Sequence, residues 1–435
     1  GPRRFCKEFP VMRLAGLIAA LALTAPAAAH AGDEQPTLSP IACPASVGQG
    51  VECLSGRDPS GAWFVIAKPE NWNRKLIVHS HGGPRTGTPE ASDSLEDLDR
   101  FAVMVREGYA WIGSTYRRGG YGVRMAAEDT DSSRRIFWAR FGRPDRTILH
   151  GQSWGGNVAA KASELYARGE DGSLNYDGVL LTNGVLMGGT RAYQFRADLR
   201  AVYQFYCRNH PSPADGAYPV WQGLPAGARM SRAELQRRIV ACTGLGLSRR
   251  ERTSVQARKL RNILAVTGIQ EDQLVAHMNW ATTLFQDLTG RVGGNPFDNS
   301  RTVYSGSSDD AALNAGVERF TADPTAVARL AHDADLTGQI TVPTMTLHAL
   351  HDPTVFFSAE AAYRQTVADA GRSDLLVQAA TDESEHSKLE DGGYMTVLRA
   401  LEGWIDSGQR PDPAAFQSQC RATFTATGCR FVPAP

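Results

Sequence analysis

Gly151-Gln152-Ser153-Trp154-Gly155-Gly156 is the most informative stretch of the sequence. An apolar run at 147–150 precedes it, and a helix-forming run at 157–165 follows it. A strand, a serine with glycine two residues to either side, and a helix form the G-x-S-x-G nucleophile elbow. This turn strains the backbone and brings strand and helix together, so side chains at the flanking positions would collide. The stretch therefore predicts an exposed Ser153 hydroxyl at the carboxyl edge of a sheet, beside the positive end of a helix.

Strand and helix patterns alternate on both sides of this elbow. The expected strands lie at 62–67, 75–80, 109–116, 146–150, 178–183, 340–348 and 374–379. The expected helices outside the elbow lie at 89–107, 128–141, 359–370 and 392–405. Such alternation predicts an α/β fold with a mostly parallel central sheet and helices on both faces.

The alternation stops between the strands at 178–183 and 340–348. Helical patterns fill much of this region, at 231–242, 251–266 and 271–288. We therefore expect a large helical insertion that covers the site as a cap. The predicted organisation, after a leader at 1–31, is a first part of the core at 32–190, a mainly helical cap at 191–338, a second part of the core at 339–410 and a tail at 411–435.

Composition is that of a globular protein. Of the 435 residues, 42% are hydrophobic and 21% are charged, which suits one large α/β domain with insertions or two average domains. The formal net charge is zero, so no basic surface favours nucleic acid, and we expect no nucleic-acid partner.

The N-terminal residues predict export. Met12-Arg13, the apolar run 14–23 and Ala29-His30-Ala31 match the charged start, short apolar region and cleavage site of a signal peptide. We expect cleavage after Ala31, and we interpret Gly1-Pro2 as a remnant of expression because no initiator methionine leads the chain. The remaining chain has 42 basic and 45 acidic residues and no apolar run long enough for a membrane anchor. A soluble periplasmic or extracellular protein is expected.

Six cysteines remain after this cleavage, and an even number in an exported chain favours disulfides. Cys43 and Cys53 are close enough in sequence for a local disulfide, as are Cys420 and Cys429. This leaves Cys207 to pair with Cys242, although six cysteines allow many other pairings. The last pair of cysteines would close the C-terminal tail.

A second glycine-rich loop, His81-Gly82-Gly83-Pro84, follows the expected strand at 75–80. Glycines at a strand end let backbone N–H groups turn toward a substrate oxygen. In α/β hydrolases this loop donates one oxyanion-hole N–H, and the residue after the serine donates the other. We therefore expect Gly83 and Trp154 to form the oxyanion hole and Gly82 to lie against the substrate. A simple Gly-Pro turn is the alternative.

Two later residues complete a candidate catalytic triad with Ser153. A serine hydroxyl needs a base to remove its proton, and that base needs a third group to orient it. The order serine, acid, histidine distinguishes α/β hydrolases from other triad enzymes. Asp352 and His386 follow this order, and each lies in a loop after an expected strand.

Other residues fit these roles less well. His348 lies inside an expected strand, and His351 sits beside the predicted acid, where its side chain would point away. Glu383 and Glu385 are too close in sequence to His386 to orient it.

Three further residues are candidates for substrate binding. Arg117 and Arg118 follow the expected strand at 109–116 and could hold a substrate carboxylate, although a structural ion pair is an equal alternative. Trp280 is one of several aromatic residues in the insertion that would line a capped pocket or fill the core of the cap. His277 is isolated, and Asp309-Asp310 lacks partners at ligand spacing, so we expect no metal.

Residues from about 60 to 407 resemble the α/β-hydrolase superfamily in the elbow, the His-Gly-Gly-Pro loop and the late Asp352 and His386. Residues 81–84, 116–122 and 151–156 are similar to motifs in the catalytic domain of the prolyl oligopeptidase family. This resemblance implies Ser153 as nucleophile, Asp352 and His386 as its partners, and no cofactor.

The chain departs from the prolyl oligopeptidase pattern in two ways. Those enzymes usually carry a β-propeller before the catalytic domain, whereas we expect only about 30 mature residues before the first strand. They also lack a helical insertion of this size. Tannase and feruloyl esterase relatives share secretion and a large lid, but this chain lacks their cysteines beside the serine and the histidine.

Taken together, these patterns predict a secreted serine hydrolase that cleaves small-molecule or polymeric carboxylic esters through an acyl-enzyme. A secreted peptidase or aminopeptidase of prolyl oligopeptidase type is the first alternative, because esters and amides use the same apparatus. A catalytically inactive homologue that only binds a ligand is the second. The oligomeric state stays open.

Overall fold

A computed structural model describes residues 35–424 and 428–435. The expected leader at 1–31 lies outside the described residues, as do residues 425–427 of the tail. Within the described ranges, no helix combines the length and apolar character needed to cross a membrane.

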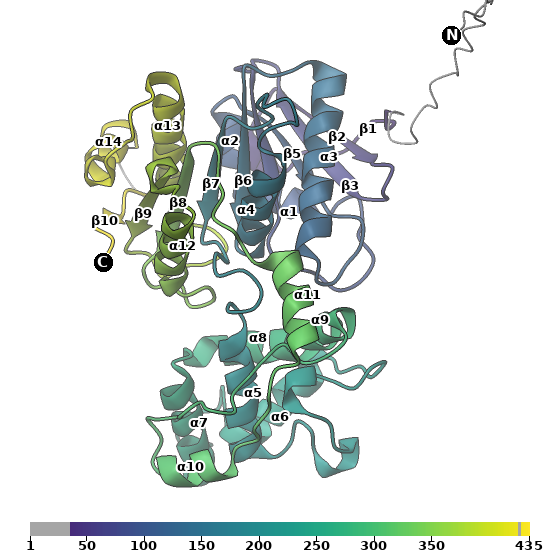
Figure 1. Ribbon diagram of the computed structural model, residues 1–435, viewed down its shortest axis with the longest axis vertical. Coiled ribbons are helices and arrows are strands. Elements are labelled where there is room, and N and C mark those ends of the chain that lie inside the picture. The colour runs from purple at the N-terminus through teal and green to yellow at the C-terminus, as the bar shows by residue number, and fades with distance from the viewer. Residues whose placement is uncertain (1–34, 425–427) are drawn as a thin grey trace, which may run out of the picture. The chain divides into compact units, whose positions relative to one another are not determined.

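A ten-stranded sheet organises the chain, in the order β1-β2-β3-β5-β4-β6-β7-β8-β9-β10 (Figure 1). The strands are β1 Ser39–Pro40, β2 Val51–Arg57, β3 Trp63–Pro69, β4 Lys75–Ser80, β5 Ala110–Ser114, β6 Arg146–Gln152, β7 Gly178–Thr182, β8 Thr344–Ala349, β9 Leu376–Thr381 and β10 Phe431–Val432. Neighbouring strands from β5 to β9 pair in parallel. The outer strands β1, β2, β3 and β10 pair antiparallel.

Helices cover both faces of this sheet, because successive strand residues point to opposite sides. In β6, Leu149 packs in the apolar core beneath α3 and α4, whereas Ile148 packs in the core that contains α1, α2 and α13. In β7, Leu181 and Leu180 divide between the two cores in the same way. The helices of this layered part are α1 Leu95–Arg100, α2 Ala102–Arg106, α3 Val123–Phe141, α4 Trp154–Tyr166, α12 Ser358–Asp369 and α13 Asp391–Ser407.

The long connection between β7 and β8 is helical. It contains α5 Gln194–Cys207, α6 Arg232–Thr243, α7 Ser254–Thr267, α8 Leu274–Asn279, α9 Phe285–Val292, α10 Asp310–Gly316 and α11 Pro324–Ala334 (Figure 1). The helix expected over 271–288 is divided, because a π-helical turn at Trp280–Leu284 separates α8 from α9. Single π-helical turns of this kind occur often at functional sites.

Two segments differ from expectation. The first expected strand begins at residue 62, but β2 lies before it and pairs with β3 along its whole length, from Val51↔Pro69 to Arg57↔Trp63. Strand β2 contains Glu52, Ser55 and Gly56, so its sequence lacks the apolar alternation that marks a strand. The C-terminal tail adds α14 Phe416–Thr423 and places β10 beside β9.

Three disulfides join the cysteines in the pairing that their spacing favoured. Cys43–Cys53 and Cys420–Cys429 close short loops, and Cys207–Cys242 connects α5 with α6 inside the insertion. The Cα–Cα distances, 5.4 to 5.7 Å, are ordinary for disulfides.

Candidate active site

Ser153 occupies the turn between β6 and α4 with a strained backbone, φ 59° and ψ −128°. The glycines around it have no room for a side chain. A Cβ on Gly151 would lie 2.1 Å from the carbonyl oxygen of Gly155, and a Cβ on Gly155 would lie 2.1 Å from that of Ser80. The strand, the turn and the helix therefore meet closely enough to hold the Ser153 hydroxyl above the carboxyl edge of the sheet.

His386 and Asp352 meet Ser153 at this edge. The Ser153 Oγ lies 2.7 Å from Nε2 of His386, and the His386 Nδ1 lies 2.8 Å from Oδ2 of Asp352. The other oxygen of Asp352 accepts hydrogen bonds from the backbone N–H groups of Thr354 (2.8 Å) and Val355 (3.0 Å). Asp352 is buried, so these contacts fix the carboxylate toward the imidazole.

The sheet is parallel in its centre and antiparallel at its edges. The elbow follows β6, the acid follows β8, and the histidine follows β9. The chain has the α/β-hydrolase fold. Its fold therefore agrees with the architecture expected from the sequence.

The loop that carries His386 is held by two side chains that the sequence did not single out. Asn183 donates its side-chain N–H to the carbonyl oxygen of His386 at 2.8 Å, and it accepts the backbone N–H of Ala349 at 2.9 Å. Gln152 donates to the same carbonyl of His386 at 3.2 Å. The sequence offered one sign that these two residues lie near the site, which is their position: Asn183 directly follows β7, and Gln152 ends β6.

A second histidine lies beside Asp352. His348 is buried in β8, with Nε2 at 3.6 Å from Asp352 and Nδ1 at 3.1 Å from Glu360. Burial by itself lowers the pKa of His348, but the Glu360 and Asp352 carboxylates raise it above its ordinary value. His348 therefore lies between the Asp352 and Glu360 carboxylates, and it has no hydrogen bond to Ser153 among the described contacts.

The glycine loop after β4 lies directly against the serine. A Cβ on Gly82 would come within 3.0 Å of the Cβ of Ser153, and Gly83 has a positive φ of 77°. Trp154 is the first residue of α4, where a backbone N–H has no acceptor inside the helix. Gly82, Gly83 and Trp154 border the same cavity as Ser153.

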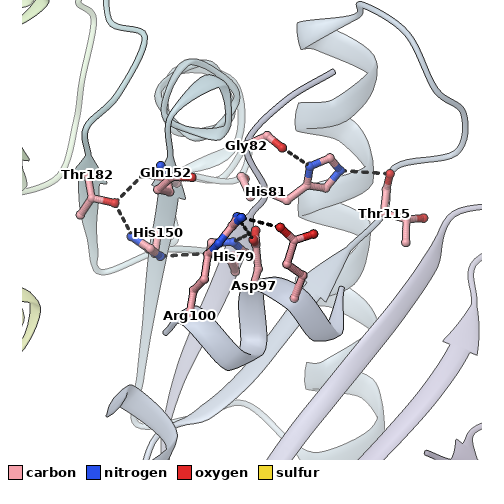
Figure 2. A network of polar contacts seen from close by, with 12 residues as sticks. His79, His81, Gly82, Asp97, Arg100, Thr115, His150, Gln152 and Thr182 are labelled. Carbon is pink, nitrogen blue, oxygen red and sulfur yellow. Dashed lines mark hydrogen bonds and ion pairs between the residues drawn. The ribbon is translucent and has the colours of Figure 1, made fainter. Parts of the chain in front are cut away.

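His81 anchors this loop (Figure 2). Its Nδ1 lies 2.9 Å from the carbonyl oxygen of Gly82, and its Nε2 lies 3.2 Å from that of Thr115. Burial lowers the pKa of His81, so the neutral ring donates to one of these carbonyls at a time. The ring also stacks on Tyr116 with 4.1 Å between ring centroids, and the Tyr116 hydroxyl donates to the His81 carbonyl.

A buried polar chain connects the three central strands beneath the site (Figure 2). The Nδ1 atoms of His79 on β4 and His150 on β6 lie 3.0 Å apart, and His150 Nε2 lies 2.9 Å from the Thr182 hydroxyl on β7. His79 Nε2 lies 2.6 Å from Asp97, which also accepts from Arg100. Burial raises the pKa of Asp97, but the contacts with His79 and Arg100 hold it well below its ordinary value. The chain fixes the strands that carry Gly82, Ser153 and Asn183 against one another.

A cavity of about 260 Å³ opens beside Ser153 and His386. The insertion supplies part of its wall through Tyr193, Arg196 and Trp280. Tyr193 and Trp280 stack with 4.4 Å between their ring centroids. Among residues 35–424 and 428–435, no three metal-ligating side chains are grouped for a metal ion.

The two arginines expected near substrate lie elsewhere. Arg117 is held by Asp129, with Nη2 at 2.7 Å from Oδ1, and it also pairs with Glu128. Arg118 donates to the carbonyl oxygens of Gly119 and Tyr121 and borders a neighbouring cavity. Neither arginine borders the Ser153 cavity, because the loop after β5 turns their guanidinium groups to other partners.

Comparison with known proteins gave one curated relative and several similar structures. The o-phthalyl amidase of Xanthobacter agilis is 29% identical over 119 residues, which are 27% of this chain and 25% of the amidase. The esterase from Aspergillus oryzae has 14% identity and a TM-score of 0.44, covering 86% of this chain and 85% of its own. Candida antarctica lipase A in its closed state has 12% identity and a TM-score of 0.45, covering 87% and 83%. No family model matches the chain.

Proposed function

We propose that this protein is a serine hydrolase that cleaves carboxylic esters through an acyl-enzyme intermediate. The observation that carries the proposal is the chain of contacts from Ser153 through His386 to Asp352, at 2.7 and 2.8 Å. This arrangement activates a hydroxyl for acyl transfer.

In the proposed reaction, Ser153 Oγ attacks the ester carbonyl while Nε2 of His386 takes the hydroxyl proton. Asp352 accepts the Nδ1–H of His386 and stabilises the imidazolium. The backbone N–H groups of Gly83 and Trp154 hold the negative oxygen of the tetrahedral intermediate. Collapse expels the alcohol, which takes the proton from His386, and a water molecule then repeats the sequence and releases the acid.

The helical insertion, expected at 191–338, acts in this proposal as a cap. Tyr193, Arg196 and Trp280 from this region border the cavity beside Ser153. Asp287 of α9 also accepts the backbone N–H of Tyr121 at 2.6 Å, in the loop between β5 and α3. The capped cavity favours small ester substrates over long polymers.

Hydrolysis of a panel of p-nitrophenyl esters by the wild type and by Ser153→Ala and His386→Ala tests the proposal. Each substitution should lower kcat by roughly four to six orders of magnitude. Ser384→Ala, an exposed serine near His386, should keep wild-type turnover. Wild-type turnover by Ser153→Ala would contradict the assignment.

Amide cleavage is the second candidate, because the curated relative is named an amidase. Aminoacyl p-nitroanilides offered beside the aryl esters separate the two activities. Faster cleavage of the anilides would replace the ester proposal with an amidase or a peptidase. Failure of a fluorophosphonate to label Ser153 would favour a ligand-binding homologue without activity.

We also propose that the protein is exported. Three disulfides join six cysteines, and disulfides persist in oxidising compartments. Expression with the native leader should give an exported protein that begins at Gly32. An intact leader on active protein in the cytoplasm would contradict this proposal.

A further inference from the structure

Arg196 is a buried cation in the wall of the Ser153 cavity. It lies in the first turn of α5, and only 6% of its surface is exposed. Its neighbours on the cavity wall include Tyr193, Trp280 and His386. A charge this deeply buried is costly unless an anion or several hydrogen bonds compensate it.

Few groups in the described residues compensate the buried charge of Arg196. Its Nε donates to Nδ1 of His277 at 3.2 Å, which is its one side-chain hydrogen bond to the described residues. The guanidinium lies over the rings of Trp280 (4.6 Å) and Phe195 (4.8 Å), which attract a cation but accept no strong hydrogen bond. Burial lowers the pKa of Arg196 to about 10, so the group stays charged at neutral pH.

Arg200, one turn further along α5, shows how this fold can pair the Nη groups of a buried arginine, although its Nε has no partner among the described residues. It is fully buried, and its Nη groups donate to the carbonyl oxygens of Gly223, Ala281 and His210. Within the described part of the chain, no carbonyl oxygen accepts a hydrogen bond from the Nη groups of Arg196. The Nη groups of Arg196 are therefore the part of the guanidinium left for a ligand.

His277 orients Arg196 toward the site. Burial, with the charge of Arg196, lowers the pKa of His277 to about 3, so the ring is neutral. Its Nε2 lies 3.0 Å from the carbonyl oxygen of Pro353 and donates to it, which leaves Nδ1 as the acceptor for Arg196 Nε. Pro353 adjoins Asp352, so the guanidinium is tied to the loop that carries the catalytic acid.

Among the described residues of the cavity wall, no anion competes for Arg196. Arg85 and Arg100 also border the Ser153 cavity, but both are paired with Glu96. None of the aspartates or glutamates in the described ranges borders this cavity. A mainly apolar cavity of about 240 Å³ adjoins it and shares Arg196 with it. Arg196 thus lies where one anionic group could be held next to an apolar group of the same ligand.

We propose that Arg196 binds a free carboxylate of the substrate, so that the preferred substrates are small esters carrying a second, ionised carboxyl group. The inference rests on the proposed ester hydrolysis at Ser153. The planar fork of Nη donors matches the two oxygens of a carboxylate.

Two matched substrate pairs test this inference, each differing only in a carboxylate or its neutral amide. Ethyl hydrogen glutarate against ethyl glutaramate places the charge on the acyl side, and 4-carboxyphenyl acetate against 4-carbamoylphenyl acetate places it on the alcohol side. In at least one pair the wild type should show a kcat/KM roughly 10- to 100-fold higher for the carboxylate. In Arg196→Gln that ratio should fall to about one, and Arg196→Lys should restore part of it because it keeps the charge without the fork.

Arg237→Gln is the matched control, because Arg237 is 69% exposed on α6, and it should keep the wild-type ratio. Equal kcat/KM values within both pairs, with turnover abolished by Ser153→Ala, would overturn this inference and leave the proposed function standing. A preference that persists in Arg196→Gln would also overturn it. Turnover that survives Ser153→Ala would instead overturn the proposed function.

A labelling experiment gives a readout that needs neither turnover nor a folded variant. Benzoate should slow the labelling of wild-type Ser153 by a fluorophosphonate more than benzamide does, because only benzoate offers a carboxylate to Arg196. Equal protection by the two compounds would overturn the inference.

Discussion

Asn183 shows how a single side chain can hold the loop of His386, the proposed catalytic base. Its amide group bridges the carbonyl of His386 and the N–H of Ala349, so it joins the histidine loop to the end of β8. In Asn183→Asp the donor becomes an acceptor and would repel the His386 carbonyl. We expect kcat for an aryl ester to fall roughly 100-fold, the scale of a small misplacement of a catalytic group. Wild-type kcat in a folded Asn183→Asp protein would contradict this role.

Residue type and order were enough to name Ser153, Asp352 and His386 as candidates, because each follows a recognisable strand and the proposed chemistry requires those types. The structure brings these three side chains together. Asn183, His79 and His150 could not be selected in this way. Their roles depend on which strands are neighbours, and the order β5-β4-β6-β7 is a property of the folded sheet. The sequence could not decide between a substrate contact and a structural ion pair for Arg117 for the same reason, because its partner Asp129 becomes visible only in space.

At the scale of the element, the close contact between α4 and β4 depends on Gly155. A Cβ at residue 155 would lie 2.1 Å from the carbonyl oxygen of Ser80 and 2.6 Å from that of His81. These oxygens belong to the backbone, which cannot move away as a flexible side chain could. Gly155→Ala should therefore displace the elbow and abolish ester hydrolysis, with a clear loss in Tm.

Gly403, in the middle of α13, has no atom within 4 Å of its Cβ position. Gly403→Ala should keep activity and stabilise the protein by up to about 1 kcal/mol. Equal Tm values for the two variants would contradict this explanation.

The limits of helices and strands were less predictable than their existence. Helix α3 begins at Val123, five residues before the expected start at 128, because the Asp333 carboxylate of α11 accepts the N–H groups of Val123 and Arg124. A cap from a side chain 210 residues away leaves no local pattern. Strand β2 was missed because its pairing with β3 compensates for a weakly apolar sequence.

For the whole molecule, buried histidines determine the response to acid. Burial lowers the pKa of His81 and His150, and it lowers that of His210 to about 2 and that of His277 to about 3. These rings are neutral in the native state, whereas the unfolded chain binds protons on them near the ordinary value of 6.5. The unfolded state therefore binds more protons below that pH, and stability falls as pH falls.

Each such histidine should lower the free energy of unfolding by about 1.4 kcal/mol for every pH unit well below 6.5. His348 affects stability in the opposite direction. Its pKa is raised in the native state, so its contribution to the free energy of unfolding is present at low pH and is lost as pH rises. Urea unfolding at pH 7.5, 6.5 and 5.5 should show a lower midpoint at 5.5 than at 6.5. A midpoint that is constant or rises toward pH 5.5 would contradict the neutral state of these histidines.

The acyl-enzyme itself is the most direct test of the whole account. Rapid mixing with p-nitrophenyl acetate, acid quenching and peptide mass mapping should find one acetyl group on the peptide containing Ser153, with a burst of p-nitrophenol close to one equivalent per protein. The same treatment of His386→Ala should give no adduct. An acetyl group on another residue, or a full burst from Ser153→Ala, would contradict the account.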